Sequence, residues 1–126
     1  MEVLALDARV IGTLAARLRK GRLVALVADR DLSTSGIPVS FCGGNSRMPA
    51  GPAVLAIQTG APLITAYVSY TESGIHIEFG AEIAVPLEGS VAEKAAEMTQ
   101  AMAERFEMGI KAKTEDWHMM QKVWVE

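Results

Sequence analysis

The sequence has few cysteines, few histidines and no cluster of positive charge, and each shortage excludes a class of protein. Cys42 is the single cysteine, which rules out an intrachain disulfide framework and a cysteine-rich zinc site. Neither His76 nor His118 has a carboxylate at the spacing that would place it on the next helical turn. A zinc site or a self-contained serine–histidine–aspartate triad is therefore not expected. Lysine and arginine total 12 against 15 acidic residues and never cluster with aromatics, so nucleic acid is not an expected partner.

Long apolar runs are also missing. No stretch approaches the roughly 18 uninterrupted apolar residues that cross a bilayer, and the opening MEVLALDARV does not read as a signal peptide. Contact with a membrane would therefore be peripheral. The chain has 126 residues, of which 50% are hydrophobic, so it fits one small packed domain or a piece of a larger one.

The first third of the chain predicts an α/β unit. Asp7 is expected to cap a helix over 8–20, and Gly21 stands where a C-cap glycine belongs. The run 23–28, LVALVA, reads as a strand that is apolar on both faces. Such strands are typical of the middle of a parallel sheet, so we predict a central, mostly parallel sheet flanked by helices.

The remainder alternates between loops, strands and helices. The segment 33–49 is predicted as a loop around a short strand at 37–41, and Ser90 with Glu93 matches a capping box at the start of the longest helix. The other expected elements are a helix from 52 or 53 through 59 capped by Gly60, strands at 62–69, 75–79 and 82–85 with a turn at 71–74, and the long helix over 90–111.

Charged residues directly after the apolar run are the main functional signal. Asp29, Arg30 and Asp31 would lie at the carboxyl end of the predicted strand, which is the edge where open α/β sheets bind ligands. A carboxylate there could orient a catalytic base or a substrate hydroxyl, and the arginine could meet a phosphate or a carboxylate. The alternative is structural, with an aspartate capping a turn and the arginine pairing with it.

Other candidates have stronger structural explanations. His76 fits a strand position, His118 a C-terminal helix, and Cys42 a small buried apolar residue. The segment 47–53, RMPAGPA, could direct helix amides at an anion, or could form an ordinary turn. The tail repeats Trp and Met at helix-like spacing, which indicates core or a covered surface before it indicates an acyl-chain or membrane contact.

Three ordered motifs carry a family resemblance. They are GRLVALVADRDLS, GIPVSFCGG and RMPAGPAVLAIQTGAP, and the tail EDWHMMQKVW agrees with them. The chain resembles the bacterial lipid A lauroyl/myristoyl acyltransferase superfamily, and within it the phosphatidylinositol mannoside acyltransferases. The resemblance implies the C-terminal part of a glycerol-phosphate-acyltransferase-like α/β fold over 1–126.

The resemblance also implies an activity. Such an enzyme transfers a fatty acyl group, typically palmitoyl, from acyl-CoA to a mannose hydroxyl of a phosphatidylinositol mannoside. It works peripherally at the cytoplasmic face of the plasma membrane, with acyl-CoA as co-substrate and without a metal or other cofactor. Its base is a histidine in an H-x4-D/E motif, which this chain does not contain, so we expect the isolated chain to be inactive and to need an N-terminal half.

Site residues follow from the matched motifs. Asp29 takes the acidic position of the (D/E)RDL motif and is expected to assist or orient the catalytic histidine, and Arg30 follows it as a substrate-binding candidate. Ser35 and Gln58 match positions that the family places near acyl-CoA. Gln58 stands where a glutamate is expected, and Cys42 replaces an aromatic of an FFG element.

Two other functions stay open. One is a non-catalytic remnant or partner module that binds acyl-CoA or lipid. The other is a generic nucleotide-binding α/β domain, which the absence of a glycine fingerprint weakens.

Overall fold

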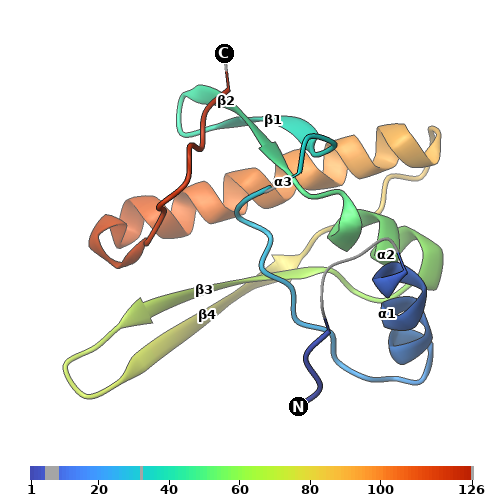
Figure 1. Cartoon of the computed structure of the whole chain (residues 1–126), viewed down its shortest axis with the longest axis horizontal. Helices are drawn as coiled ribbons and strands as arrows, with labels where there is room; N and C mark the ends of the chain where they lie inside the picture. Colours follow the sequence, from blue (N-terminus) through green and yellow to red (C-terminus); the bar gives the residue numbers. More distant parts are fainter. Residues whose placement is uncertain (5–8, 32, 126) are drawn as a thin grey trace.

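A computed structural model of the chain describes residues 1–4, 9–31 and 33–125, and it combines helices with two antiparallel hairpins (Figure 1). The elements are α1 Val10–Arg19, β1 Ile37–Phe41, β2 Gly44–Met48, α2 Gly51–Thr59, β3 Ile64–Tyr70, β4 Ile75–Glu82, α3 Val91–Ala112 and the 3₁₀ turn η1 Thr114–Asp116. Within the described residues, no helix is long and apolar enough to span a bilayer.

The long helix α3 organises the molecule. The β1–β2 hairpin lies along one side of it, while α2 and β3 pack against other parts of its surface, and α1 packs on α2 (Figure 1). Met98, Met102 and Ala103 of α3 are buried in this core. The approach of β3 is close at one point, since a Cβ added to Gly109 would lie 2.6 Å from Tyr67 Cγ. A glycine is therefore required there for contact rather than for backbone conformation.

Helix ends follow the predicted signals. The Ser90 hydroxyl accepts a hydrogen bond from the Glu93 amide at 3.2 Å and caps α3, as the capping box predicts. Gly21 and Gly60 adopt φ of 74° and 72° just after α1 and α2, which confirms both terminating glycines. The predicted cap Asp7 lies outside the described residues.

The β1–β2 hairpin was only half predicted. β1 occupies the predicted residues 37–41, but 44–48 forms β2 where a loop was expected. Cys42 and Gly43 make the two-residue turn, with φ of 49° and 78°. Positive φ at both positions is typical of a type I′ turn, although cysteine is an unusual residue for it. The sequence did not predict β2, because GNSRM lacks the β-branched and aromatic residues that are typical of strands.

The second hairpin departs less from expectation. β3 and β4 fall at the two predicted strands, and the Thr71 amide donates to the Gly74 carbonyl across the predicted turn. The separate strand predicted at 82–85 is wrong, because β4 itself continues to Glu82 and no strand follows it among the described residues before α3.

The predicted central parallel sheet is not seen, and this is the main correction to the predicted fold class. Residues 22–28 run without a strand partner in the described structure, and the only sheets there are the two antiparallel hairpins. The run is not buried either, since Leu23 is 94% exposed and Val27 76%, whereas Ala28 is 7% exposed. An apolar run predicts a buried strand only if neighbouring strands pair with it and cover it, and among the described residues no strand pairs with this run.

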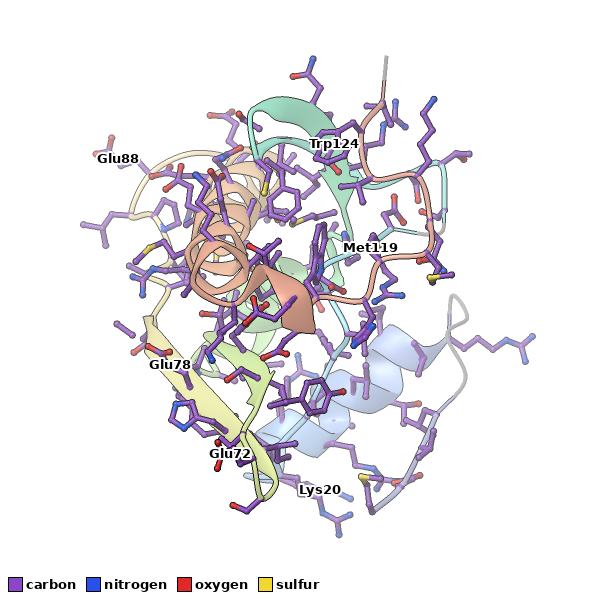
Figure 2. All side chains as sticks on the ribbon, turned by 90° about the vertical axis from the view of Figure 1, so that its left-hand side faces the viewer. Lys20, Glu72, Glu78, Glu88, Met119 and Trp124 are labelled. Carbon is purple, nitrogen blue, oxygen red and sulfur yellow. The ribbon has the colours of Figure 1, made fainter. Side chains whose placement is uncertain are left out.

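Up to residue 125, where the described structure ends, the tail is not helical beyond η1. It continues past the β1–β2 hairpin, where Trp124 forms a single bridge with Ser46, and Figure 2 shows Met119 and Trp124 along this path. The Trp124 indole fits against Gly44, where a Cβ would lie 2.2 Å from the ring. The helix-like spacing of the aromatic residues was therefore misleading, because Trp117 packs on the core and Trp124 contacts the β1–β2 turn without a helix between them.

Candidate functional site

Asp29 is held by two side chains. Its Oδ2 accepts a hydrogen bond from the Trp117 indole Nε1 at 3.1 Å, and its Oδ1 lies 3.3 Å from Arg30 Nε. Trp117 is itself fixed by an edge-on contact with Phe41 at 6.0 Å between ring centroids. The carboxylate is thus oriented by the C-terminal tail and the β1–β2 hairpin rather than by the edge of a parallel sheet.

A cavity of about 320 Å³ opens beside this carboxylate. Residues 26–30 form one wall, residues 66–68 of β3 another, and Phe106 and Ile110 of α3 contribute apolar surface. Its charged and polar lining comes from Asp29, Arg30, Tyr67, Asp116 and His118. A volume near 300 Å³ with apolar walls and a few polar groups is typical of the small end of ligand pockets.

Polar groups in this cavity are ordered by the backbone around η1. The Asp116 carboxylate accepts from the Tyr70 amide at 2.9 Å, and Tyr67 donates its hydroxyl to the Lys113 carbonyl at 3.2 Å. Burial, followed by the charges of Asp116, Glu115 and Asp29, raises the pKa of Tyr67. Tyr67 therefore stays a neutral hydrogen-bond donor at physiological pH.

The loop after Asp29 is a network of short polar contacts. Asp31 Oδ1 accepts from the amide and hydroxyl of Ser33, at 2.9 and 2.7 Å, and Ser33 Oγ lies 3.1 Å from Ser35 Oγ. Gly36 has no room for a side chain, because a Cβ there would lie 2.0 Å from Asp31 Oδ2. Asp31 therefore stabilises the loop, in agreement with the structural alternative in which an aspartate caps a turn.

Arg30 ties this loop to the tail. Its Nη1 donates to Gln121 Oε1 at 3.2 Å and its Nη2 to the His118 carbonyl at 3.4 Å. Arg47 makes a similar link, donating to the Thr34 carbonyl at 2.7 Å. Both arginines are thus engaged with protein groups, and an anion would have to share or displace these contacts.

The predicted site residues are only partly brought together. Asp29, Arg30 and Ser35 lie on one continuous stretch, and the first two line the cavity. Gln58 is exposed near the end of α2 and lines neither this cavity nor the smaller one of about 70 Å³ beside Arg47. The ligand roles of Ser35 and Gln58 stay predictions.

Sequence reasoning missed the partner of Asp29. Trp117 lies 88 positions along the chain from Asp29, and no local sequence pattern predicts their hydrogen bond. His118 was favoured as a structural residue, yet it lines the cavity and packs its ring edge-on to Tyr70 at 6.2 Å between centroids. The signal that could have found both is the polar–aromatic group DWH of the tail.

Comparison with known proteins agrees with the motifs. The chain is 41% identical over 112 residues to a phosphatidylinositol mannoside acyltransferase of Mycobacterium tuberculosis (strain H37Rv), covering 89% of the chain and 34% of that relative. It is 42% identical over 112 residues to the protein of the same name from Mycolicibacterium smegmatis, covering 89% of the chain and 35% of that relative.

The chain therefore spans about a third of the length of these curated relatives. The family profile described as bacterial lipid A biosynthesis acyltransferase matches residues 1–126. Because this match covers the whole chain, the chain belongs to the bacterial lipid A biosynthesis acyltransferase family.

Proposed function

We propose that this chain supplies part of the active site of an enzyme that transfers a palmitoyl group from acyl-CoA to a mannose hydroxyl of a phosphatidylinositol mannoside. The observation that carries the proposal is the Asp29 carboxylate, oriented by Trp117 on the wall of a cavity that has both apolar and polar lining. The identity of the glycolipid acceptor is inferred from the names of the relatives.

The chemistry requires a base that this chain does not provide. The mannose oxygen attacks the thioester carbonyl carbon, the carbon–sulfur bond breaks, and the hydroxyl proton passes through the base to the departing CoA sulfur. In the proposed enzyme the base is a histidine from the part of the polypeptide that the aligned third does not cover. Asp29 acts on that histidine as a positioning residue, because a carboxylate accepting an imidazole N–H fixes its orientation and stabilises its charged form.

The geometry around Asp29 leaves capacity for this role. A carboxylate offers about four lone-pair sites, and Trp117 and Arg30 account for two of them in the described structure. Apolar walls from Phe106, Ile110 and Val68 suit a segment of acyl chain. Ser35 and Gln58 are assigned to acyl-CoA binding by their motif positions alone.

The proposed place of action is the cytoplasmic face of the plasma membrane, with peripheral attachment. The acceptor is a membrane lipid and acyl-CoA is a cytoplasmic metabolite, so the reaction belongs at the surface where the two meet.

The test uses a complete enzyme, made by joining the upstream two-thirds of the M. smegmatis relative to this chain. Palmitate transfer from palmitoyl-CoA to a mannosylated phosphatidylinositol is measured, with the KM for palmitoyl-CoA and the thermal midpoint. Asp29→Asn should lower kcat about 10²-fold or more, the range for a lost proton-transfer contribution, with little change in KM. Glu88→Gln, at an exposed position remote from the cavity, is the matched control (Figure 2).

Near wild-type turnover of Asp29→Asn would remove Asp29 from the mechanism. An inactive joined enzyme that is folded and binds palmitoyl-CoA would overturn the proposed activity. The chain alone should transfer no palmitate in the same assay.

A second candidate is a non-catalytic module that binds acyl-CoA or lipid. The observation that favours it is that both oxygens of Asp29 are already engaged within the chain. Saturable binding of palmitoyl-CoA to the chain alone, with an inactive joined enzyme, would favour this module over the acyltransferase.

A further inference from the structure

The C-terminal tail, residues 117–125, is fixed to the rest of the chain at both ends. Near its start, the His118 carbonyl accepts a hydrogen bond from Arg30 at 3.4 Å. At its far end, the Val125 amide donates to the Asn45 carbonyl of β2 at 2.8 Å. In Figure 1 the tail runs from the end of α3 along the β1–β2 hairpin. A segment anchored at two separate points holds its side chains in place although it is not helical.

Trp117, the first residue of the tail, is constrained in both its backbone and its side chain. Its amide donates to the Thr114 carbonyl at 3.2 Å, which fixes the backbone just after η1. Its ring meets Phe41 edge-on and packs on the core formed by the β1–β2 hairpin and α3. An indole has two side-chain torsions and a single N–H donor, so packing of the ring also fixes the direction of that donor. Trp117 therefore holds Asp29 from a rigid support.

Arg30 is the other contact of Asp29, and it is a weaker constraint. Its Nε lies 3.3 Å from Asp29 Oδ1, and the arginine side chain is 30% exposed. Ion pairs between partly exposed side chains contribute little, because solvent screens them and a long side chain loses freedom in forming them. The hydrogen bond from Trp117 is also charge-assisted, but the core already holds its donor. The indole is therefore the contact that sets the orientation of the Asp29 carboxylate.

We propose that Trp117 is a positioning residue of the acyl transfer reaction and acts through Asp29. The inference rests on the proposed function for the reaction itself. A carboxylate that is free to turn would meet the imidazole N–H of the catalytic histidine for only part of the time. Misplacement of a positioned group by about 1 Å can cost about 10²-fold in rate. By holding Asp29, Trp117 makes the C-terminal tail part of the catalytic apparatus.

Trp117 also lines the cavity, so it has a second conceivable role as a wall for the acyl chain. The two roles differ in their kinetics. A wall that binds the acyl chain equally in the ground state and the transition state affects the KM for palmitoyl-CoA, whereas a residue that orients Asp29 affects kcat. The geometry favours positioning, because the polar atom of the ring is directed at the carboxylate.

The first measurement tests the hydrogen bond in the chain alone. Nitrogen–proton correlation spectra show the indole N–H groups, and Trp117→Phe and Trp124→Phe assign their signals. Asp29→Asn replaces the charged acceptor of Trp117 by a neutral one, so the Trp117 indole signal should shift. The Trp124 signal should stay in place, since its acceptor is the Phe41 carbonyl. An unshifted Trp117 signal would overturn the proposal.

The second measurement follows palmitate transfer by the joined enzyme, well below the unfolding midpoint of each variant. Trp117→Phe removes the donor and keeps most of the ring, so kcat should fall about 10-fold with little change in the KM for palmitoyl-CoA. Trp124→Phe removes the same donor at the far end of the tail, where the acceptor is a backbone carbonyl, and should leave kcat unchanged. Arg30→Gln should lower kcat by less than Trp117→Phe does.

The double variant that combines Asp29→Asn with Trp117→Phe separates a positioning role from a structural one. If the indole acts only through the Asp29 carboxylate, the double variant should turn over at the rate of Asp29→Asn alone. Independent effects would multiply instead, to about 10³-fold below the unaltered enzyme. Multiplied losses would contradict the proposal. So would a raised KM with an unchanged kcat in Trp117→Phe, or a larger loss of kcat in Arg30→Gln.

Failure of the proposed function would give a different pattern. An inactive joined enzyme, or near wild-type turnover of Asp29→Asn, would remove the reaction and with it the role of Trp117 in catalysis, whatever the indole spectra show. A slow Asp29→Asn variant beside a fully active Trp117→Phe variant would leave the proposed function standing and overturn the role of Trp117 alone.

Discussion

The two tryptophans of the tail make the same kind of bond to acceptors of different charge. Trp117 donates to the Asp29 carboxylate at 3.1 Å, and Trp124 donates to the neutral Phe41 carbonyl at 3.0 Å. Hydrogen bonds to charged groups stabilise proteins more than neutral ones do. The pair therefore separates the contribution of the Asp29 contact from that of anchoring the tail in general.

We expect Trp117→Phe to cost about 1–3 kcal/mol of unfolding free energy and Trp124→Phe about 0.5–1.5 kcal/mol. Phenylalanine keeps most of the ring packing but cannot donate a hydrogen bond, so the difference reports the acceptor. Urea unfolding followed by far-UV circular dichroism measures both. An equal or reversed order would show that Asp29 gains nothing from the indole.

Cys42 is shielded at the hairpin turn. Its amide donates to Glu107 Oε2 at 3.1 Å, and Glu107 also receives the Lys111 ammonium. Burial first, and the negative charge of Glu107 second, raise the pKa of the thiol, while Lys111 opposes them. A raised thiol pKa lowers the fraction of thiolate, the reactive form, near neutral pH.

The thiolate is the species that reacts with iodoacetamide, so a raised pKa moves the pH–rate profile of Cys42 upward relative to free cysteine. Glu107→Gln removes a negative charge beside the sulfur, and we expect its profile to move back toward lower pH. Glu104→Gln, on the next exposed turn of α3, should leave the profile in place. A Cys42 profile at or below that of free cysteine would contradict the shielding.

At the scale of elements, two helical glycines differ in whether a neighbouring side chain leaves room for a Cβ. Gly12 and Gly109 both lie inside helices with ordinary backbone angles, where alanine usually stabilises by about 0.5–1 kcal/mol. A Cβ at Gly12 meets nothing within 4 Å, but at Gly109 it would lie 2.6 Å from Tyr67 Cγ and 3.1 Å from Tyr67 Cβ. The same substitution should therefore have opposite signs in α1 and α3.

We expect Gly12→Ala to raise the unfolding free energy by about 0.5–1 kcal/mol and Gly109→Ala to lower it by about 1–3 kcal/mol. The loss at Gly109 arises because β3 must move away from α3 or Tyr67 must leave its position. Thermal and urea unfolding of the two variants provide the comparison. Stabilisation by both would mean that Tyr67 does not pack on α3 in solution.

Elements whose causes are local were predictable. The capping box at Ser90 and the glycines at 21 and 60 set helix ends, because each acts within one turn of the backbone. Elements that depend on distant partners were not. The strand character of 44–48 comes from pairing with β1, and 23–28 forms no strand because no strand among the described residues pairs with it.

The candidate site divides in the same way. The charge cluster beginning at Asp29 is visible in the sequence because three charges directly follow an apolar run. The indole that holds Asp29 comes from the tail, and part of the cavity lining comes from β3. Such placements follow from tertiary packing, which no local spacing encodes, so the carboxylate could be predicted but its surroundings could not.

For the molecule as a whole, we expect local stability to be highest in α3 and lowest in the β3–β4 hairpin and segment 23–28. The core contains side chains of α3 together with Phe41 and Met48, and these are buried. The β3–β4 hairpin, in contrast, exposes an apolar face. Amides hydrogen-bonded in a core exchange only when that core opens, while unpaired amides exchange at almost the unfolded rate.

Hydrogen exchange with mass spectrometry should resolve this gradient. In the chain alone we expect peptides covering 23–28 to exchange within about tenfold of the unfolded rate and those covering 98–103 to be at least about 10³-fold slower. Strong protection of 23–28 in the chain alone would contradict this gradient, because it would mean that these amides already have acceptors in solution.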